Sequence, residues 1–323
     1  MAAAVSNAGA LGSIGVGATN ADGARKMIAA VRERCKCPLH VNVFCHQPAE
    51  SDPAVEAAWL DYLRPEFERV GAQPPTDLKE IYRSFLVDDA MLAALLADRP
   101  RVVSFHFGLP STERIRALRE AGIVLLASAT NPDEARAGEK AGMHAIIAQG
   151  YEAGGHRGIF NPEVQDDCIG TFALTRMLVR QLNVPVIAAG GIMDGAGITA
   201  VLRLGAQAAQ MGTAFVSCSE SDADPGYRQV LASDAAQHTI ITRAISGRPA
   251  RCLSNRFTQL GMSVAPQKVP AYPISYDAAK RLHNAAKTAG EWGYGAQWAG
   301  QGAPLARAMP AAELVATLAR ELT

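Results

Sequence analysis

The stretch at residues 149–158 combines a histidine with four glycines directly after an apolar run. It reads Gln-Gly-Tyr-Glu-Ala-Gly-Gly-His-Arg-Gly, so His156 lies on backbone that can approach a ligand closely. The apolar run at 145–149 is typical of a buried strand, and loops that follow the strands of an α/β barrel form its active face. A histidine there can act as a base or donate a hydrogen bond near neutral pH. A lone histidine is more often structural, but this setting favours a catalytic role for His156.

Two glycine-containing turns follow two further apolar runs. Gly190 and Gly191 come after the run at 186–189, and Gly212 and Thr213 come after the run that begins at 208. Loops after the last strands of a barrel often bind phosphate, because glycine lets backbone N–H groups approach the anion. Tight turns without a ligand would explain one such pair. Two pairs in consecutive units favour a cofactor that carries phosphate.

Other side chains give weaker signals. His106 ends the run at 102–108 and could point into the mouth of a barrel. Tyr276 and Lys280 are four residues apart, so on a helix they would share a face and could hold a small anion, although a solvated surface pair explains the spacing better. The histidines show no HxxxH spacing, so we predict no metal site, and the absence of a Gly-x-Ser-x-Gly motif argues against a serine hydrolase.

The composition excludes several classes of protein. The 323 residues include 31 Lys plus Arg and 31 Asp plus Glu, which leaves no basic field to hold nucleic acid or an anionic membrane. No apolar run reaches the roughly 18 residues that a membrane span needs. The six cysteines form no CxxC pairs and are expected to be free thiols in a reducing compartment. We therefore expect a soluble, cytoplasmic protein that acts on a small molecule.

The elements that must position these residues alternate along the chain. Short apolar runs are separated by amphipathic stretches, which indicates a parallel sheet with helical crossovers. A closed barrel of this kind has eight strands, but only seven runs are present, and the chain opens on a helical segment at 1–8. Either the sheet is open and doubly wound, or the first strand is absent from this sequence. The runs lie at 11–16, 39–45, 102–108, 123–129, 145–149, 186–189 and 208–212, and the clearest helices at 22–34, 112–121, 132–141, 172–182 and 195–204.

The alternation of strands and helices stops after residue 216. Residues 217–299 carry helical and loop patterns with clusters of Gly, Pro and Trp, which predicts a smaller, mainly helical subdomain. The segment at 310–322 has Leu314, Leu318 and Leu322 on one face, as an outer helix of the barrel would. The predicted organisation is therefore a barrel formed by 1–216 and 300–323, with 217–299 inserted.

Several of these motifs together resemble the class I nitronate monooxygenases, formerly called 2-nitropropane dioxygenases. The most specific match is Glu-Ala-Gly-Gly-His-Arg-Gly at 152–158, whereas the Gly-Gly and Met-Gly-Thr pieces are shared with other flavin barrels. Members of that family begin with a strand ahead of the Ala-Ala-Ala-Val-Ser helix, and here that segment is missing. The resemblance therefore implies a (β/α)₈ barrel that lacks its first strand. The matching stretches are 3–13, 41–46, 103–108, 149–158, 188–195, 210–215, 276–280 and 296–302.

The resemblance implies the cofactor FMN and a set of site residues. It makes His156 the central catalytic residue and implies that alkyl nitronates are oxidised by O₂ to a carbonyl compound and nitrite. We also expect a homodimer. The substrate pocket would be lined by His106, Tyr82, Tyr276 and Lys280. The flavin would be held by Asn42, Gln149, Gly154, Gly190, Gly191, Gln210, Met211, Gly212 and Thr213, with its phosphate at Gly191 and at 210–213.

Two other functions fit the same motifs. An NAD(P)H-dependent FMN reductase acting on quinones or enoyl thioesters would use the same barrel and similar glycine loops, because a fold does not fix a function. A non-catalytic flavin or anion binder is the third possibility.

Overall fold

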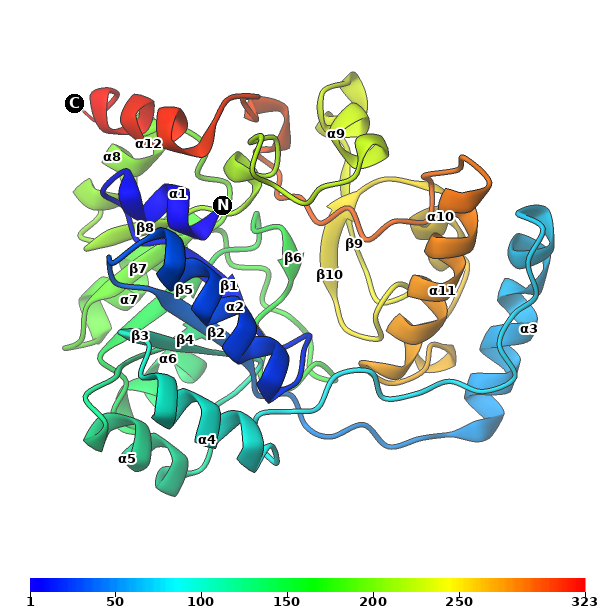
Figure 1. Cartoon of the computed structure of the whole chain (residues 1–323), viewed down its shortest axis with the longest axis horizontal. Coiled ribbons are helices and arrows are strands. Elements are labelled where there is room, and N and C mark those ends of the chain that lie inside the picture. Colours follow the sequence, from blue (N-terminus) through cyan, green and yellow to red (C-terminus); the bar gives the residue numbers. More distant parts are fainter. Residues whose placement is uncertain (323) are drawn as a thin grey trace.

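A curved sheet of seven parallel strands forms the centre of the larger part of the molecule, with helices around its outer face (Figure 1). This computed structural model describes residues 1–322. The strands pair in chain order, without the reversal that a doubly wound sheet requires, so the barrel architecture is confirmed. They are β1 (Ser13–Gly15), β2 (His40–Phe44), β3 (Val102–His106), β4 (Val124–Ala129), β5 (Ala145–Gln149), β7 (Val186–Ala189) and β8 (Ala208–Gln210).

The sheet is open between its first and last strands in the part of the chain described. Strand β1 pairs only with β2, and β8 pairs only with β7, within residues 1–322. Each of the seven apolar runs recognised in the sequence contains one of these strands. The predicted number of strands is therefore confirmed.

Helices follow the strands and begin where polar side chains cap them. The side chains of Ser111, Asn131 and Asp194 each accept a hydrogen bond from the backbone amide three residues later, which satisfies one of the free donors of the first helical turn. No helix within residues 1–322 combines the length and apolarity needed to cross a bilayer. The helices around the sheet are α2 (Ala21–Arg34), α4 (Asp89–Asp98), α5 (Thr112–Glu120), α6 (Pro132–Lys140), α7 (Thr171–Gln181) and α8 (Gly195–Arg203), with α1 (Ala2–Asn7) against α12 (Ala311–Arg320).

Alternate residues of the strands face the two sides of the sheet. Val41, Val103 and Leu125 belong to the core between the sheet and its helices. Their neighbours Asn42 and Ser104, which pair across β2 and β3, face the inner side instead. The inner side of the sheet therefore carries polar side chains, which a purely structural barrel core would not need.

A smaller unit lies beside the open mouth of the sheet (Figure 1). It contains a three-stranded antiparallel sheet in the order β6 (Gly155–His156), β10 (Ala250–Leu253) and β9 (Thr239–Thr242). The helices of this part of the chain are α9 (Pro225–Leu231), α10 (Arg256–Met262) and α11 (Ile274–Thr288), and α3 (Pro53–Arg69) packs against α11. Short 3₁₀ turns lie at Thr213–Phe215, Asp234–Gln237, Pro266–Lys268 and Ala303–Leu305.

Two features of this unit differ from the sequence analysis. Strands β9 and β10 lie in a range where helices and loops were expected, because four residues are too short a run to show a strand pattern. Helix α3 lies in the range 1–216 that the sequence analysis assigned to the barrel. Its Trp59 and Leu63 share a buried cluster with Leu282 of α11. Hydrophobic periodicity shows that a helix buries one face but not which core receives it. We propose that α3 belongs to the smaller unit.

Candidate active site

A cavity of about 280 Å³ lies where the parallel strands of the barrel end. Ligands bind at this end of such barrels, because the loops after the strands converge there. The cavity gathers most of the site residues expected from the sequence, which come from positions 42 to 213 of the chain. They are Asn42, His106, Gln149, Gly154, His156, Gly190, Gly191, Gln210, Met211, Gly212 and Thr213.

His156 is held on the wall of this cavity by both its backbone and its ring. It lies on β6 and pairs with Ala250 of β10. Its carbonyl oxygen accepts hydrogen bonds from Gln149 Nε2 at 3.0 Å and from His106 Nε2 at 3.2 Å. The ring Nε2 lies 2.8 Å from the hydroxyl oxygen of Ser246. Ser246 is 90 residues away in sequence, which is why sequence analysis did not single it out.

Burial keeps the histidines of the site uncharged. Loss of solvation, together with smaller effects of the nearby His106, Arg248 and His46, lowers the pKa of His156 to about 3. Burial likewise lowers the pKa of His106 to about 4. Both rings are therefore neutral at neutral pH, which is the form that can accept a proton.

Polar side chains on the inner face of the sheet form the floor of the cavity. His40 Nε2 lies 2.7 Å from Ser104 Oγ, which donates to Asn42 Oδ1 at 2.9 Å. His106 Nδ1 lies 3.0 Å from Ser128 Oγ. The sequence analysis did not identify His40, Ser104 or Ser128, although their alternation along the strands was the available signal. Among the described residues no cluster of His, Cys, Asp and Glu could hold a metal ion.

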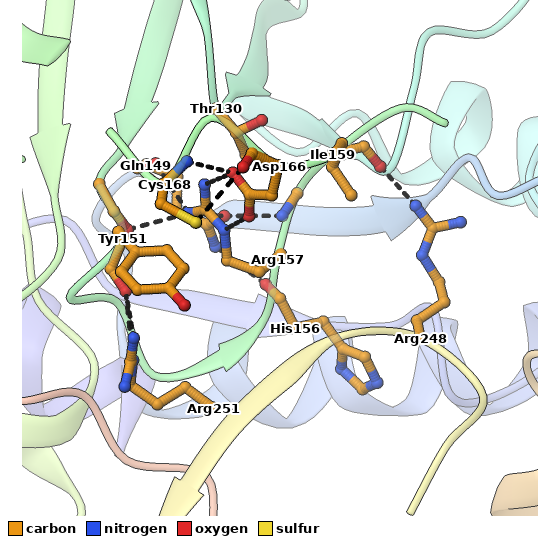
Figure 2. Close-up of polar contacts among 12 residues, drawn as sticks. Thr130, Gln149, Tyr151, His156, Arg157, Ile159, Asp166, Cys168, Arg248 and Arg251 are labelled. Carbon is orange, nitrogen blue, oxygen red and sulfur yellow. Dashed lines mark hydrogen bonds and ion pairs between the residues drawn. The ribbon is translucent and has the colours of Figure 1, made fainter. Parts of the chain in front are cut away.

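Arg157 ties the His156 loop to the end of β5 (Figure 2). Its fully buried guanidinium pairs with Asp166 at 2.7 Å and donates to the carbonyl oxygens of Gln149 at 3.1 Å and Gly150 at 3.0 Å. Gln149 Oε1 in turn accepts from the amide of Gly158 at 2.6 Å. Both ends of the loop are therefore fixed to one strand, and this positions His156 between them.

The Arg157–Asp166 pair gives a prediction about stability. Burial raises the pKa of Asp166, but the hydrogen bonds from Arg157 and from the Cys168 amide, with the charge of Arg157, outweigh it and leave the pKa below the usual 3.8. The ionised Asp166 carboxylate therefore stabilises the folded state above about pH 4. This contribution is lost as the pH falls through the lowered pKa. We expect Asp166→Asn to reduce the free energy of unfolding at pH 7 by about 3 kcal/mol, because it leaves a buried guanidinium unpaired.

Urea unfolding at pH 7 and pH 3 checks this, with Asp133→Asn as the control. Asp133 also pairs with an arginine, Arg136, but its side chain is 90% exposed and should contribute little. The difference in the free energy of unfolding between Asp166→Asn and the parent should be smaller at pH 3 than at pH 7. Equal losses in the two variants would contradict this account.

Glycine backbone forms part of the cavity wall. Gly190 and Gly191 have φ angles of 121° and 70°, which favour glycine. The amides of Gly191 and Gly212 donate no hydrogen bond within residues 1–322. A Cβ on Gly154 would lie 2.5 Å from the Gly300 nitrogen, so no larger residue fits there without a shift of the backbone. These free donors are suited to binding an anion.

Tyr82, Tyr276 and Lys280 do not line the main cavity but lie beside it. The rings of His156 and Tyr276 are 6.2 Å apart, and Lys280 Nζ is 4.8 Å from the Tyr82 ring and 5.3 Å from the Tyr276 ring. Tyr276 and Lys280 face a second cavity of about 310 Å³. The Trp298 ring lies 5.0 Å from that of His156 and 6.2 Å from that of Tyr276, and this residue was not named as a site residue from the sequence.

Comparisons with known proteins agree with this geometry. The family model described as nitronate monooxygenase matches residues 1–321. A nitronate monooxygenase of Paraburkholderia phytofirmans is 61% identical over 322 residues, which cover 100% of this chain and 88% of the relative. One from Pseudomonas aeruginosa is 53% identical, with 100% and 92% covered. The chain belongs to the nitronate monooxygenase family. The resemblance seen in the sequence is thereby confirmed.

Solved structures show that the similarity extends to the fold. Nitroalkane oxidase from Streptomyces ansochromogenes superposes with a TM-score of 0.91 at 42% identity, over 99% of this chain and 90% of that one. FabK from Thermotoga maritima superposes with a TM-score of 0.74 at 31% identity, over 99% and 87%. The arrangement of barrel and smaller unit is thus closer to the nitroalkane oxidase.

Proposed function

We propose that this protein oxidises alkyl nitronates, such as propionate 3-nitronate, with O₂ to a carbonyl compound and nitrite, using FMN in the main cavity. The observation that carries the proposal is the position of His156. Its neutral ring lies on the wall of a cavity that also offers unpartnered glycine amides. The names of the relatives support the same reaction. The cytoplasmic location and a homodimer stay predictions.

The residues present fit a flavin phosphate and ring. Gly191 and the 210–213 turn would hold the phosphate, because the amides of Gly191 and Gly212 donate no hydrogen bond within residues 1–322 and Gly212 has open space around its α-carbon. Asn42, Gln149 and Gly154 would contact the rest of the cofactor, since all three line the same cavity. When bound, FMN supplies the electron transfer to O₂.

His156 would handle the charge and proton of the substrate. Ser246 Oγ lies 2.8 Å from His156 Nε2 and 3.2 Å from the carbonyl oxygen of Arg248. We assign the ring proton to Nε2, so that Ser246 accepts it and donates its own proton to that carbonyl. The lone pair of the ring is then on Nδ1, where it can accept the α-proton of a neutral nitroalkane. For a preformed nitronate no proton is removed. A His156 ring protonated on both nitrogens, together with the positive charge of Lys280 beside the cavity, would stabilise the negative charge.

Nitrite release measures the proposed reaction directly. The flavin-loaded protein, given propionate 3-nitronate and O₂, should release nitrite at a rate proportional to enzyme concentration, and removal of O₂ should stop it. The reductase alternative is tested by mixing the protein with NADH without O₂. Rapid bleaching of the flavin by NADH, together with no nitrite from the nitronate, would overturn the proposal. A protein that retains flavin but shows neither response would be a binder.

A further inference from the structure

Arg248 is a buried cation without an ionic partner. Its side chain is buried, with 4% of the residue exposed, and no carboxylate among residues 1–322 forms an ion pair with it. The guanidinium donates to the carbonyl oxygen of Ile159, and its Nε has no hydrogen-bond partner. An unpaired buried charge is costly for folding, so a function has to be sought for it.

The carboxylates that act electrostatically on Arg248 are engaged elsewhere. Glu134 accepts hydrogen bonds from Thr130 and from the amide of Phe160 at 2.7 Å. Glu163 pairs with Arg243 at 2.9 Å and is largely exposed. The positive charge of Arg248 is therefore incompletely compensated within the protein.

Arg248 is joined to the active site through Phe107 and Ser246. Its guanidinium carbon lies 4.4 Å from the centre of the Phe107 ring, and Phe107 lines the main cavity. The Phe107 ring is 5.6 Å from that of His156, and its backbone has a φ of 74°, a strained value for this residue. Ser246 contacts both the His156 ring and the Arg248 backbone. Figure 2 shows the hydrogen bond from Arg248 to the carbonyl oxygen of Ile159.

We propose that Arg248 is a positioning residue whose uncompensated charge, held against Phe107, makes the pocket at His156 prefer an anion to a neutral molecule of the same shape. This inference rests on the proposed function, because a nitronate is the anionic form of a nitroalkane. At an effective dielectric constant of about 20, a unit charge several ångströms away changes affinity by about tenfold or more. Arg248 would thus set the charge preference without touching the substrate.

The same charge acts on the histidines, which gives an independent readout. Burial is the main cause of the low pKa of His156, and Arg248 lowers it further, as it does for His106 and His46. Removing the charge should raise the pKa of His156. The titratable or charged groups that face its ring are His46, His106, Arg248, Tyr272 and Tyr276.

The test uses isobutyrate and isobutyramide, which have nearly the same shape and differ in charge. Their dissociation constants are measured by calorimetry on the flavin-loaded protein. Arg248→Gln keeps a donor for Ile159 but removes the charge, and we expect it to weaken isobutyrate binding about tenfold and isobutyramide binding less than about twofold. Arg248→Lys should keep the parental ratio.

Arg251→Gln is the matched control. Arg251 is also buried, with 3% exposed, and lies on β10, but its guanidinium binds the carbonyl of Tyr151 at 2.9 Å and is not among the charges that shift the pKa of His156. This variant should leave the isobutyrate-to-isobutyramide ratio unchanged. Titration of ¹⁵N-labelled histidine by NMR should show a higher pKa for His156 in Arg248→Gln alone.

Two results would overturn the inference: an unchanged ratio in Arg248→Gln, or a ratio that falls tenfold in Arg248→Lys, where the charge is retained. If Arg248→Gln does not fold, Arg248→Met should show the same loss of isobutyrate binding relative to isobutyramide. The Arg248→Lys variant then still tests whether the charge sets the ratio. The probes do not react, so a protein that releases no nitrite would refute the proposed function while the probe ratio still reports on Arg248.

Discussion

Replacing His156 with asparagine should lower turnover of neutral nitroalkanes by about 10²–10⁴-fold and leave the fold intact. Asparagine cannot take up a proton near neutral pH. The contacts that hold this loop come from the backbone: the carbonyl of residue 156 accepts from Gln149 and His106, and the strand pairs with Ala250. These backbone contacts do not depend on the side chain, so the variant should fold and bind flavin like the parent. The loss should be smaller for preformed nitronates, which need no deprotonation.

His238→Asn is the control for this variant, because His238 is exposed and outside both cavities. Steady-state rates with a nitroalkane and its nitronate, flavin absorbance and thermal unfolding should be measured for both variants. His156→Asn that oxidises both substrates at the parental rate would show that His156 is a structural residue of the loop.

Introducing leucine at Gly212 should weaken FMN binding by about 100-fold or more, so that the purified protein loses its yellow colour. The backbone of Gly212 has a φ of −119°, which any residue can adopt, and no atom lies within 4 Å of a Cβ placed there. Leucine therefore fits the fold but occupies open space on the cavity wall and blocks approach to the free amide. The effect should appear in flavin content and not in folding.

Ala137→Leu on the exposed face of α6 is the matched control, since it adds the same side chain away from the cavity. Flavin per protein, from absorbance after gel filtration, should be parental in the control and close to zero in Gly212→Leu. Unchanged flavin content in Gly212→Leu would place the phosphate elsewhere.

The strands and helices of the barrel were predictable from the sequence because their signals are local. The inner strands β2, β3, β4, β5 and β7 are short apolar runs that are mostly buried, whereas β1 and β8 at the open edges are partly exposed. Helices such as α5 and α6 begin at a capping side chain, Ser111 or Asn131. The position of His156 relative to the glycine turns also followed from the sequence. All three lie directly after strands of one parallel sheet, and the ends of such strands meet at one edge.

Other parts of the site depend on contacts between residues far apart in the chain. Ser246 contacts the His156 ring although the two residues are 90 apart in sequence, and Ala250, close to Ser246 in the chain, pairs with His156. The strands that pair here, β6 and β10, have two and four residues and leave no readable pattern in the sequence. Likewise Trp59 and Leu63 lie on the buried face of α3, but only the three-dimensional structure shows that this face packs against α11. The sequence by itself determined which residues can do chemistry and the order of the barrel strands. The tertiary structure decided which charges are compensated and which rings surround His156, because burial and pairing are properties of the packed chain.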